Sequence, residues 1–300
     1  MIRALLVTVL VLALPAGAQA TTIAVIGDTP YGAQQVASFP GDVEAINADP
    51  AVERVIHLGD IKSGSTVCSD AYFAFIKSQF DAFDDPLVYT PGDNEWTDCH
   101  RPNNGGYDPL ERLAKLREVF FAGTQENAIW FEGGAQFGTV HVVGSNNGLA
   151  PWTGNTAPTP AQLAEVDERT TAALRAIDRI FARAHANRAA GVVVGMQADM
   201  WDGGVVASGF VPIIKRLEQR AHEFRKPVLL LEGDSHSWIV DHPIAKAPNL
   251  TRVVVQGSTN CPHTYLRLHV DPASTAVFSG ENVTLPLDPA CDAAPPLGGF

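Results

Sequence analysis

Short apolar runs recur along the chain, and most end in glycine or aspartate and are followed by a stretch with helical spacing. This alternation is typical of buried parallel strands that are joined by crossover helices. We expect strands at residues 22–26, 54–58, 86–90, 138–143, 191–195, 227–231, 251–255 and 265–270. We expect helices at residues 69–83, 109–121, 160–187 and 211–224. The pattern therefore predicts an α/β protein.

Proline and aspartate mark the beginnings of two of these helices. Pro109 and Pro160 suit a first helical turn, where the missing N–H is not needed, and Asp108 suits the N-cap position before Pro109. Residues 146–160 are expected to form a long loop near the pocket at the strand ends. The segment from residue 285 onward is expected to lie over the surface as a tail. No linker or repeat divides the chain, so we expect a single domain over residues 21–300.

The first twenty residues differ from the rest. Arg3 precedes an apolar run, and Ala18, Gln19 and Ala20 place small residues at the spacing of a cleavage site. We expect a cleavable signal peptide over residues 1–20 and hence a secreted or periplasmic protein. The apolar run is too short to span a bilayer comfortably, and no later stretch approaches the roughly 20 apolar residues that a membrane-spanning helix needs.

Export changes the interpretation of the cysteines, because an oxidising compartment favours disulfides over thiols or metal ligation. No Cys-x-x-Cys spacing supports a zinc site. The four cysteines permit three pairings. We favour Cys68 with Cys99 and Cys261 with Cys291, since the first two each follow a strand-end motif by a similar short distance.

The formal net charge of −12 argues against long nucleic acids and anionic membranes as partners. A bound cation still makes one acidic pocket attractive to a phosphate group. The charge is therefore compatible with a small phosphorylated substrate.

Four of the predicted strands end in the same dipeptide, Gly-Asp: Gly27–Asp28, Gly59–Asp60, Gly92–Asp93 and Gly233–Asp234. In an open α/β sheet, ligands bind in the crevice outside the carboxyl ends of the strands; glycine there permits a sharp turn, and aspartate projects a carboxylate. A single such pair is most often a turn or an N-cap. Four converging carboxylates, however, repel one another unless cations lie among them. The recurrence therefore indicates a divalent metal site.

The order and spacing of these motifs, from Gly27 to His236, resemble those of the calcineurin-like metallophosphoesterase superfamily. That family's pattern runs Asp-x-His, Gly-Asp, Gly-Asn-His-Asp/Glu, a strand-end His, and Gly-His-x-His. The resemblance implies a four-layer α/β/β/α sandwich and a centre of divalent metal ions, expected to be two. Carried over position by position, it implies metal ligands at Asp28, Tyr31, Asp60, Asp93, Gln197, Asp234 and His236.

The chain departs from the family pattern at several of these positions. Pro30 stands where the first histidine is expected, and Tyr31 beside it is assigned as a phenolate ligand, as in purple acid phosphatases. Asp93 replaces the family's asparagine ligand, while Gln197 and Asp234 replace histidines. The resulting set is rich in oxygen donors, which shifts the expected preference from zinc toward magnesium, manganese, calcium or iron.

The implied reaction is hydrolysis of a phosphate ester by a metal-activated water. Asn94 stands where the family has its catalytic histidine, and it can donate a hydrogen bond but no proton. We therefore consider His100, His236 and His263 for the acid role, and favour His100 because it follows the Asn94 loop and lies beside Cys99. Arg101 and Lys62 are expected to hold phosphate oxygens, or else to pair with the surplus carboxylates.

Two other functions remain as alternatives. Gly233-Asp234-Ser235 resembles the nucleophile block of the Gly-Asp-Ser esterases, but that block belongs near the start of such a fold, and no Asp-x-x-His follows it here. The stronger alternative is a non-catalytic secreted relative that keeps the fold and binds a partner, because several histidines of the family pattern are replaced.

Overall fold

The computed structural model of the protein describes residues 19–122, 126–285, 291 and 294–300. The predicted signal peptide lies outside the described residues, apart from its last two positions. Within the described part of the chain, no helix combines the length and apolarity that crossing a membrane requires.

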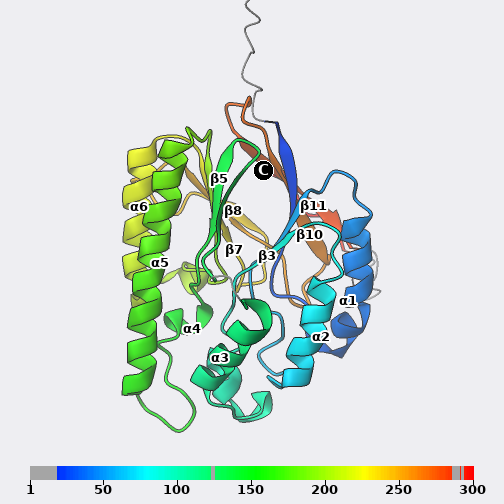
Figure 1. Ribbon diagram of the computed structural model, residues 1–300, viewed down its shortest axis with the longest axis vertical. Coiled ribbons are helices and arrows are strands. Elements are labelled where there is room, and N and C mark those ends of the chain that lie inside the picture. The colour runs from blue at the N-terminus through cyan, green and yellow to red at the C-terminus, as the bar shows by residue number, and fades with distance from the viewer. Residues whose placement is uncertain (1–18, 123–125, 286–290, 292–293) are drawn as a thin grey trace, which may run out of the picture.

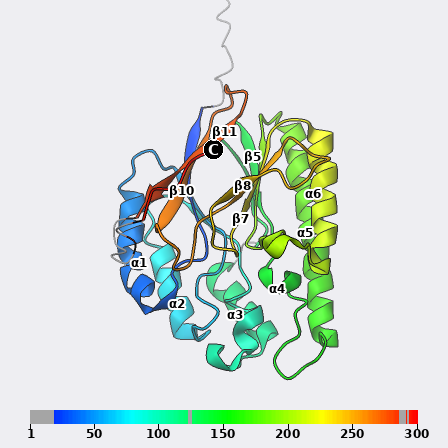
Figure 2. The same cartoon turned by 180° about the vertical axis from the view of Figure 1, so that it is seen from behind.

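Two mixed β-sheets form the centre of the molecule (Figures 1 and 2). The first has the order β11-β10-β1-β2-β3, in which β1, β2 and β3 are parallel and β10 and β11 are antiparallel to their neighbours. Its strands are β1 (Thr21–Ile26), β2 (Arg54–His57), β3 (Leu87–Tyr89), β10 (Thr264–Val270) and β11 (Phe278–Thr284). The second has the order β4-β5-β6-β7-β9-β8, with β5, β6, β7 and β9 parallel and β4 and β8 antiparallel at its edges. Its strands are β4 (Ile129–Glu132), β5 (Ala135–Thr139), β6 (Val192–Gly195), β7 (Val228–Glu232), β8 (Ile239–Asp241) and β9 (Leu250–Val254).

Helices cover the outer face of each sheet. The first sheet is covered by α1 (Gly32–Asn47) and α2 (Asp70–Phe80), and the second by α5 (Pro160–Ala186) and α6 (Val211–Phe224). The helix α3 (Pro109–Phe120) and the short α4 (Gly144–Asn147) lie beyond one end of the sheets (Figure 1). The predicted α/β/β/α sandwich is confirmed.

The apolar residues that the sequence places in its strands form the inner core. Val25 and Ile56 of the first sheet and Val193 and Leu231 of the second belong to one buried cluster between the sheets. Burying a side chain of this size contributes about 1.5–3 kcal/mol relative to leaving it exposed. This packing fixes the carboxyl ends of the strands relative to one another.

Most of the predicted elements lie close to their observed positions. The strand predicted at residues 138–143 is shifted, because β5 ends at Thr139 and the buried segment after it is irregular. Asp108 is confirmed as the N-cap of α3, since its carboxylate accepts hydrogen bonds from the N–H groups of Leu110 (2.8 Å) and Glu111 (3.2 Å). Among the helices and strands, α1, α4, β4, β8 and β11 were not predicted.

Both predicted disulfide pairs are confirmed. The Cα atoms of Cys68 and Cys99 lie 5.9 Å apart, and those of Cys261 and Cys291 lie 5.0 Å apart. The first bond ties the segment before α2 to the short 3₁₀ helix Thr97–His100 that follows β3. The second ties Cys291 of the predicted tail to the segment before β10.

Candidate metal centre

The aspartates of the Gly-Asp motifs converge beyond the carboxyl ends of strands from both sheets. Asp60 follows β2, Asp93 follows β3 and Asp234 follows β7, and one carboxylate oxygen from each lies within 4.8 Å of those of the other two. The packed sheets therefore bring together three carboxylates that are far apart in the sequence.

Several residues of this cluster have strained backbone conformations. Asp28, Asp60, Asp234 and His236 have φ values of 52°, 54°, 68° and 63°, in the left-handed region. Residues with side chains rarely occupy this region, and such strained positions gather at functional sites. The turns after β1, β2 and β7 thus direct polar side chains toward one point at a conformational cost.

Two glycines of the Gly-Asp motifs are required because a carboxylate of another motif approaches each of them closely. A Cβ atom on Gly92 would lie 2.0 Å from Oδ1 of Asp60, and one on Gly233 would lie 2.3 Å from Oδ2 of Asp28. Each glycine therefore makes room for the carboxylate of a different motif.

The buried carboxylate of Asp28 faces the half-buried side chain of His236. Oδ2 of Asp28 accepts the backbone N–H of Asp234 (2.9 Å), and Oδ1 faces Nε2 of His236 at 3.4 Å without any hydrogen bond of good geometry. Burial raises the pKa of Asp28, although contact with His236 opposes this shift. Burial lowers the pKa of His236, but contact with the Asp28 carboxylate and the charge of that carboxylate outweigh burial, and the pKa is raised.

Asp60 lies at the centre of a second network. Its Oδ2 accepts hydrogen bonds from the Tyr31 hydroxyl (2.8 Å) and from Nδ2 of Asn94 (2.7 Å), and its Oδ1 accepts the Asn94 backbone N–H (3.1 Å). Burial and the charges of Asp93 and Glu95 raise the pKa of Asp60 well above its usual range. Burial and the charge of Asp60 likewise raise the pKa of Tyr31 well above its usual range.

Asp93 is held by residues in the segments that follow β5 and β6 of the second sheet. Gln197 accepts the Gly144 N–H through Oε1 (2.7 Å) and directs Nε2 toward Oδ1 of Asp93 (3.4 Å). Ser145 donates to Oδ2 of Asp93 (2.6 Å). In this arrangement, the oxygen of Gln197 already accepts one hydrogen bond.

Glu95 links the turns of two Gly-Asp motifs through hydrogen bonds to both. Its Oε1 accepts the N–H groups of Asp60 (3.1 Å) and Gly92 (2.7 Å) and the hydroxyl of Tyr89 (2.7 Å). Its Oε2 is buried without a hydrogen-bond partner. Glu95 therefore positions the turns that carry Asp60 and Asp93.

No family model and no curated protein matches the sequence. Solved structures, in contrast, match the fold of the chain. A dimetal phosphatase from Danio rerio is 10% identical with a TM-score of 0.56, covering 89% of this chain and 99% of its own. The purple acid phosphatase PPD1 from yellow lupin (Lupinus luteus) seeds is 12% identical with a TM-score of 0.56, and the match covers 96% of this chain and 54% of that one.

A third structure, GAP50 of Plasmodium, described as the anchor in the inner membrane complex, is 10% identical with a TM-score of 0.53, covering 94% of this chain and 88% of that one. The chain has the calcineurin-like metallophosphoesterase fold. At these identities the likeness concerns the fold, and the side chains of this chain must carry any argument about chemistry.

Within this metallophosphoesterase fold, the residues matched by position lie together. Hydrogen bonds and close carboxylates link all seven predicted ligands in one cluster: Asp28, Tyr31, Asp60, Asp93, Gln197, Asp234 and His236. Their assignment as ligands stays a prediction. The donor set fits a divalent cation, because buried carboxylates that repel one another are the oxygen ligands that hard cations prefer.

Two residues proposed for the chemistry have other partners. Lys62 is wholly buried, and its ammonium donates to the backbone carbonyls of Ser63 (2.9 Å) and Asn94 (2.6 Å), so it supports the turn after β3. Burial lowers the pKa of Lys62 to about 8. His100 contacts Thr153 through Nδ1, at 2.7 Å from Oγ1 and 2.9 Å from the backbone N.

His263, the further alternative, pairs with Asp42 at 3.1 Å. His236 is therefore the one of these three histidines that contacts a strand-end aspartate of the cluster.

Sequence reasoning missed Ser145 and Asp98. Asp98 is nearly buried, lies 2.7 Å from Nη2 of Arg101, and has its Oδ1 3.3 Å from the Ser145 hydroxyl. Burial and the charge of Asp93 raise the pKa of Asp98 to about 7. The available signals were Gly144–Ser145 after an apolar run and the position of Asp98 beside Cys99, and neither matches a family motif.

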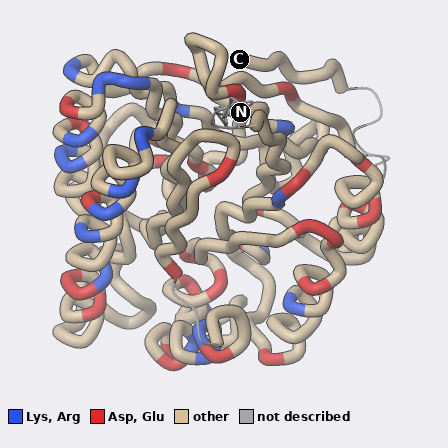
Figure 3. Tube along the Cα trace, turned by 45° about the horizontal axis from the view of Figure 1, so that its top comes forward, with Lys and Arg blue, Asp and Glu red and all other residues tan. Residues whose placement is uncertain are grey.

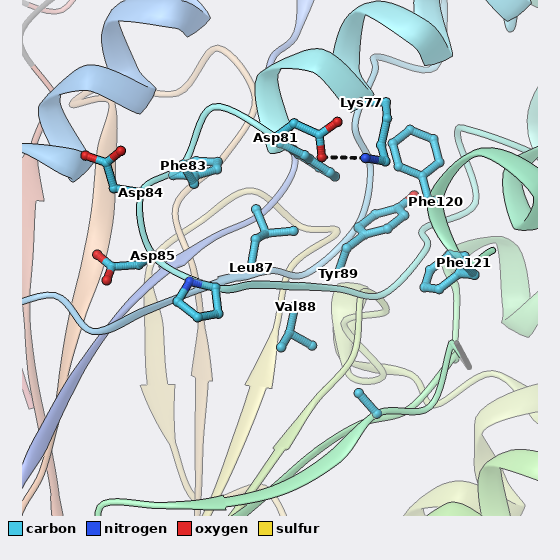
Figure 4. A pocket seen from close by; sticks show the side chains of 13 residues that line it. Lys77, Asp81, Phe83, Asp84, Asp85, Leu87, Val88, Tyr89, Phe120 and Phe121 are labelled. Carbon is cyan, nitrogen blue, oxygen red and sulfur yellow. Dashed lines mark hydrogen bonds and ion pairs between the residues drawn. The ribbon is translucent and has the colours of Figure 1, made fainter. Parts of the chain in front are cut away.

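A cavity of about 560 Å³ lies elsewhere, at the edge strand β3 (Figure 4). Its lining includes Phe83, Phe120 and Phe121 and the carboxylates of Asp84 and Asp85, but none of the Gly-Asp aspartates. We place the functional centre at the converging aspartates because ligating groups, rather than cavity volume, determine where a metal binds.

Proposed function

We propose that the protein hydrolyses phosphate esters with the help of divalent metal ions, expected to be two. The observation that carries this proposal is the convergence of Asp60, Asp93 and Asp234 within 4.8 Å at the strand ends of a metallophosphoesterase fold. The dimetal phosphatase and the purple acid phosphatase with the same fold support this reaction class.

The proposed ligands divide into two sets that share Asp60. Asp28, Tyr31 and His236 join Asp60 on one side, and Asp93, Asp234 and Gln197 join it on the other. Bound divalent cations supply the Lewis acidity that polarises a phosphoryl oxygen and activates a water for attack on phosphorus. The oxygen-rich set favours magnesium, manganese, calcium or iron over zinc.

Arg101 is proposed to bind the phosphate oxygens of the substrate. A Cβ atom on Gly64 would lie 3.0 Å from Oδ1 of Asn94 and 3.3 Å from Nη1 of Arg101, so the guanidinium lies close to Asn94. The side chain of Arg101 is 41% exposed and is held by Asp98. A guanidinium that is partly exposed and fixed by an ion pair suits recognition of a phosphate group.

Asn94 is proposed to orient Asp60 and Tyr31 rather than to transfer a proton, since an amide donates hydrogen bonds but is not an acid. His236, which faces Asp28, is the remaining candidate for proton donation to the leaving group. We propose a small phosphorylated substrate and an exported protein; the two disulfides support export.

The test compares Asp60→Asn with wild type in hydrolysis of chromogenic phosphate monoesters and diesters over a panel of divalent ions. We expect metal-stimulated turnover in wild type and a loss of more than about a hundredfold in the variant, since even outer-shell changes at metal sites cost up to about a hundredfold. Asp167→Asn, a change at an exposed position on α5, is the matched control and should behave as wild type. Turnover that needs no metal, or that Asp60→Asn leaves intact, would contradict the proposal.

A binding protein without catalysis is the second candidate. The observation that favours it is the replacement of the family's catalytic histidine by Asn94, together with the GAP50 structure, a protein with this fold that is described as an anchor. This alternative predicts no turnover under any metal, even where the protein binds one.

A further inference from the structure

A second cavity, of about 480 Å³, lies between α5, the end of α3 and the segment before β4. One wall is a single face of α5, because its lining residues are spaced by three and four positions: Glu168, Ala172, Arg175 and Arg179. The facing wall is formed by Arg117, Phe121, Glu126 and Asn127. None of the proposed metal ligands lines this cavity.

Arg175 and Arg179 are exposed, and neither makes an ion pair or hydrogen bond with any residue that the structure describes. This contrasts with Arg216 and Arg220 of the neighbouring α6, which both pair with Asp178. The chain has a net charge of −12, yet ten of its 21 Lys and Arg residues lie between residues 169 and 226, and Figure 3 shows basic residues gathered on this pair of helices, at the left.

The acidic residues of the cavity do not neutralise these two arginines. Glu126 pairs with Arg117 and with Nδ1 of His141 (2.8 Å), so its carboxylate is already engaged. Burial raises the pKa of Glu126, but His141 and Arg117 outweigh burial and hold it well below its usual range. Glu168 is the one other carboxylate in the lining, so one negative charge faces the two positive charges of Arg175 and Arg179. The cavity therefore presents a positive surplus.

We propose that this cavity binds a small organic anion with at least two negative charges and an apolar body. Two guanidinium groups one helical turn apart can each donate paired hydrogen bonds to carboxylate or phosphate oxygens. Phe121 and Ala172 supply the apolar surface, and the volume lies within the usual range for small-molecule sites, about 300–1,000 Å³. The proposal does not depend on catalysis at the metal centre.

The test measures binding of phenylphosphonate, a non-hydrolysable dianion with an aromatic body, by titration calorimetry with the full-length chain. The proteins compared are Asp60→Asn alone and Asp60→Asn combined with either Arg175→Gln/Arg179→Gln or Arg183→Gln. Asp60→Asn serves as the parent because it weakens any binding of the anion at the metal centre. The heat of binding that remains then reports on the cavity. Arg183 is exposed and lies one turn further along α5 outside the lining, so it is the matched control for loss of charge.

We expect the double arginine substitution to weaken binding by about tenfold or more, since it removes the charge-assisted hydrogen bonds of both guanidinium groups to the anion. The Arg183→Gln protein should bind as the Asp60→Asn parent does. Benzene-1,3-dicarboxylate, tested in parallel, distinguishes a carboxylate ligand from a phosphonate-like one. Equal weakening by Arg183→Gln, no effect of the double substitution, or no binding of either anion to the parent would overturn the proposal.

Discussion

Asp28, Asp60 and Asp234 combine a left-handed backbone with a buried or half-buried carboxylate. Neither feature favours folding, since strained conformations and repelling charges both cost free energy. A role in binding cations explains both at once, because a cation needs several carboxylates that are aimed at one point.

Replacing Gly92 by alanine should disturb the centre without removing a ligand. The new Cβ would fall 2.0 Å from Oδ1 of Asp60, so the carboxylate or the turn after β3 must shift. We expect Gly92→Ala to weaken Mn²⁺ binding, measured by calorimetry, by roughly ten- to a hundredfold, as for other changes that misorient ligands. Gly298→Ala, at a glycine with no atom near its Cβ position, is the control. Unchanged affinity in Gly92→Ala would contradict this view of the turn.

The strand-end aspartates can be predicted from the sequence because each Gly-Asp pair directly follows an apolar run. The sequence did not identify Ser145 or Asp98, since their roles arise from contacts across the two sheets and beside a disulfide. The sequence shows the charge of Lys62, which predicts contact with phosphate oxygens or with the surplus carboxylates, but it does not show the complete burial of this side chain.

The long helix α5 shows how local signals define an element. Thr159 is its N-cap and forms a capping box with Gln162, and Pro160 occupies the first turn. Pro160 predicts this beginning from the sequence, and the capping box is a feature that the structure adds. By contrast, α1 contains Pro40 and begins at Gly32 without a side-chain cap, and the edge strands β4 and β8 are short, so neither periodicity nor end signals marked them.

Thr159→Ala should destabilise α5 by removing the side-chain acceptor of the Gln162 N–H (3.1 Å). Loss of such a cap costs about 1 kcal/mol, so the free energy of unfolding in urea should fall by that amount. Thr156→Ala, at an exposed position in the preceding loop, should change it by less than about 0.5 kcal/mol. Equal effects of the two substitutions would argue against the capping role.

In the molecule as a whole, two sheets packed face to face hold carboxylates from opposite sheets in contact. Burial and the charges of Asp93 and Asp28 raise the pKa of Asp234, and burial with Asp93 and Glu95 raises that of Asp60. Without metal, both groups bind protons more tightly in the folded than in the unfolded chain. Their contribution to stability is therefore fully present below the unfolded value of about 3.9 and is lost as pH rises through the raised folded values.

Divalent cations should reverse this loss at neutral pH, because they bind the charged carboxylates of the folded state. We expect Mn²⁺ or Mg²⁺ to raise the melting temperature, followed by calorimetry, and to raise it more near pH 7.5 than near pH 5, where protons compete for Asp60 and Asp234. An increase that does not depend on pH would contradict the assignment of these carboxylates as ligands.

The most direct measurement is the metal content of the purified protein, determined by elemental analysis after dialysis against divalent ions. The proposed ligand sets predict two ions per chain in wild type and a reduced number in Asp60→Asn, the residue that both sets share. A wild-type protein that retains no divalent ion, or an Asp60→Asn protein that retains as many as wild type, would contradict a metal centre at the converging strand ends.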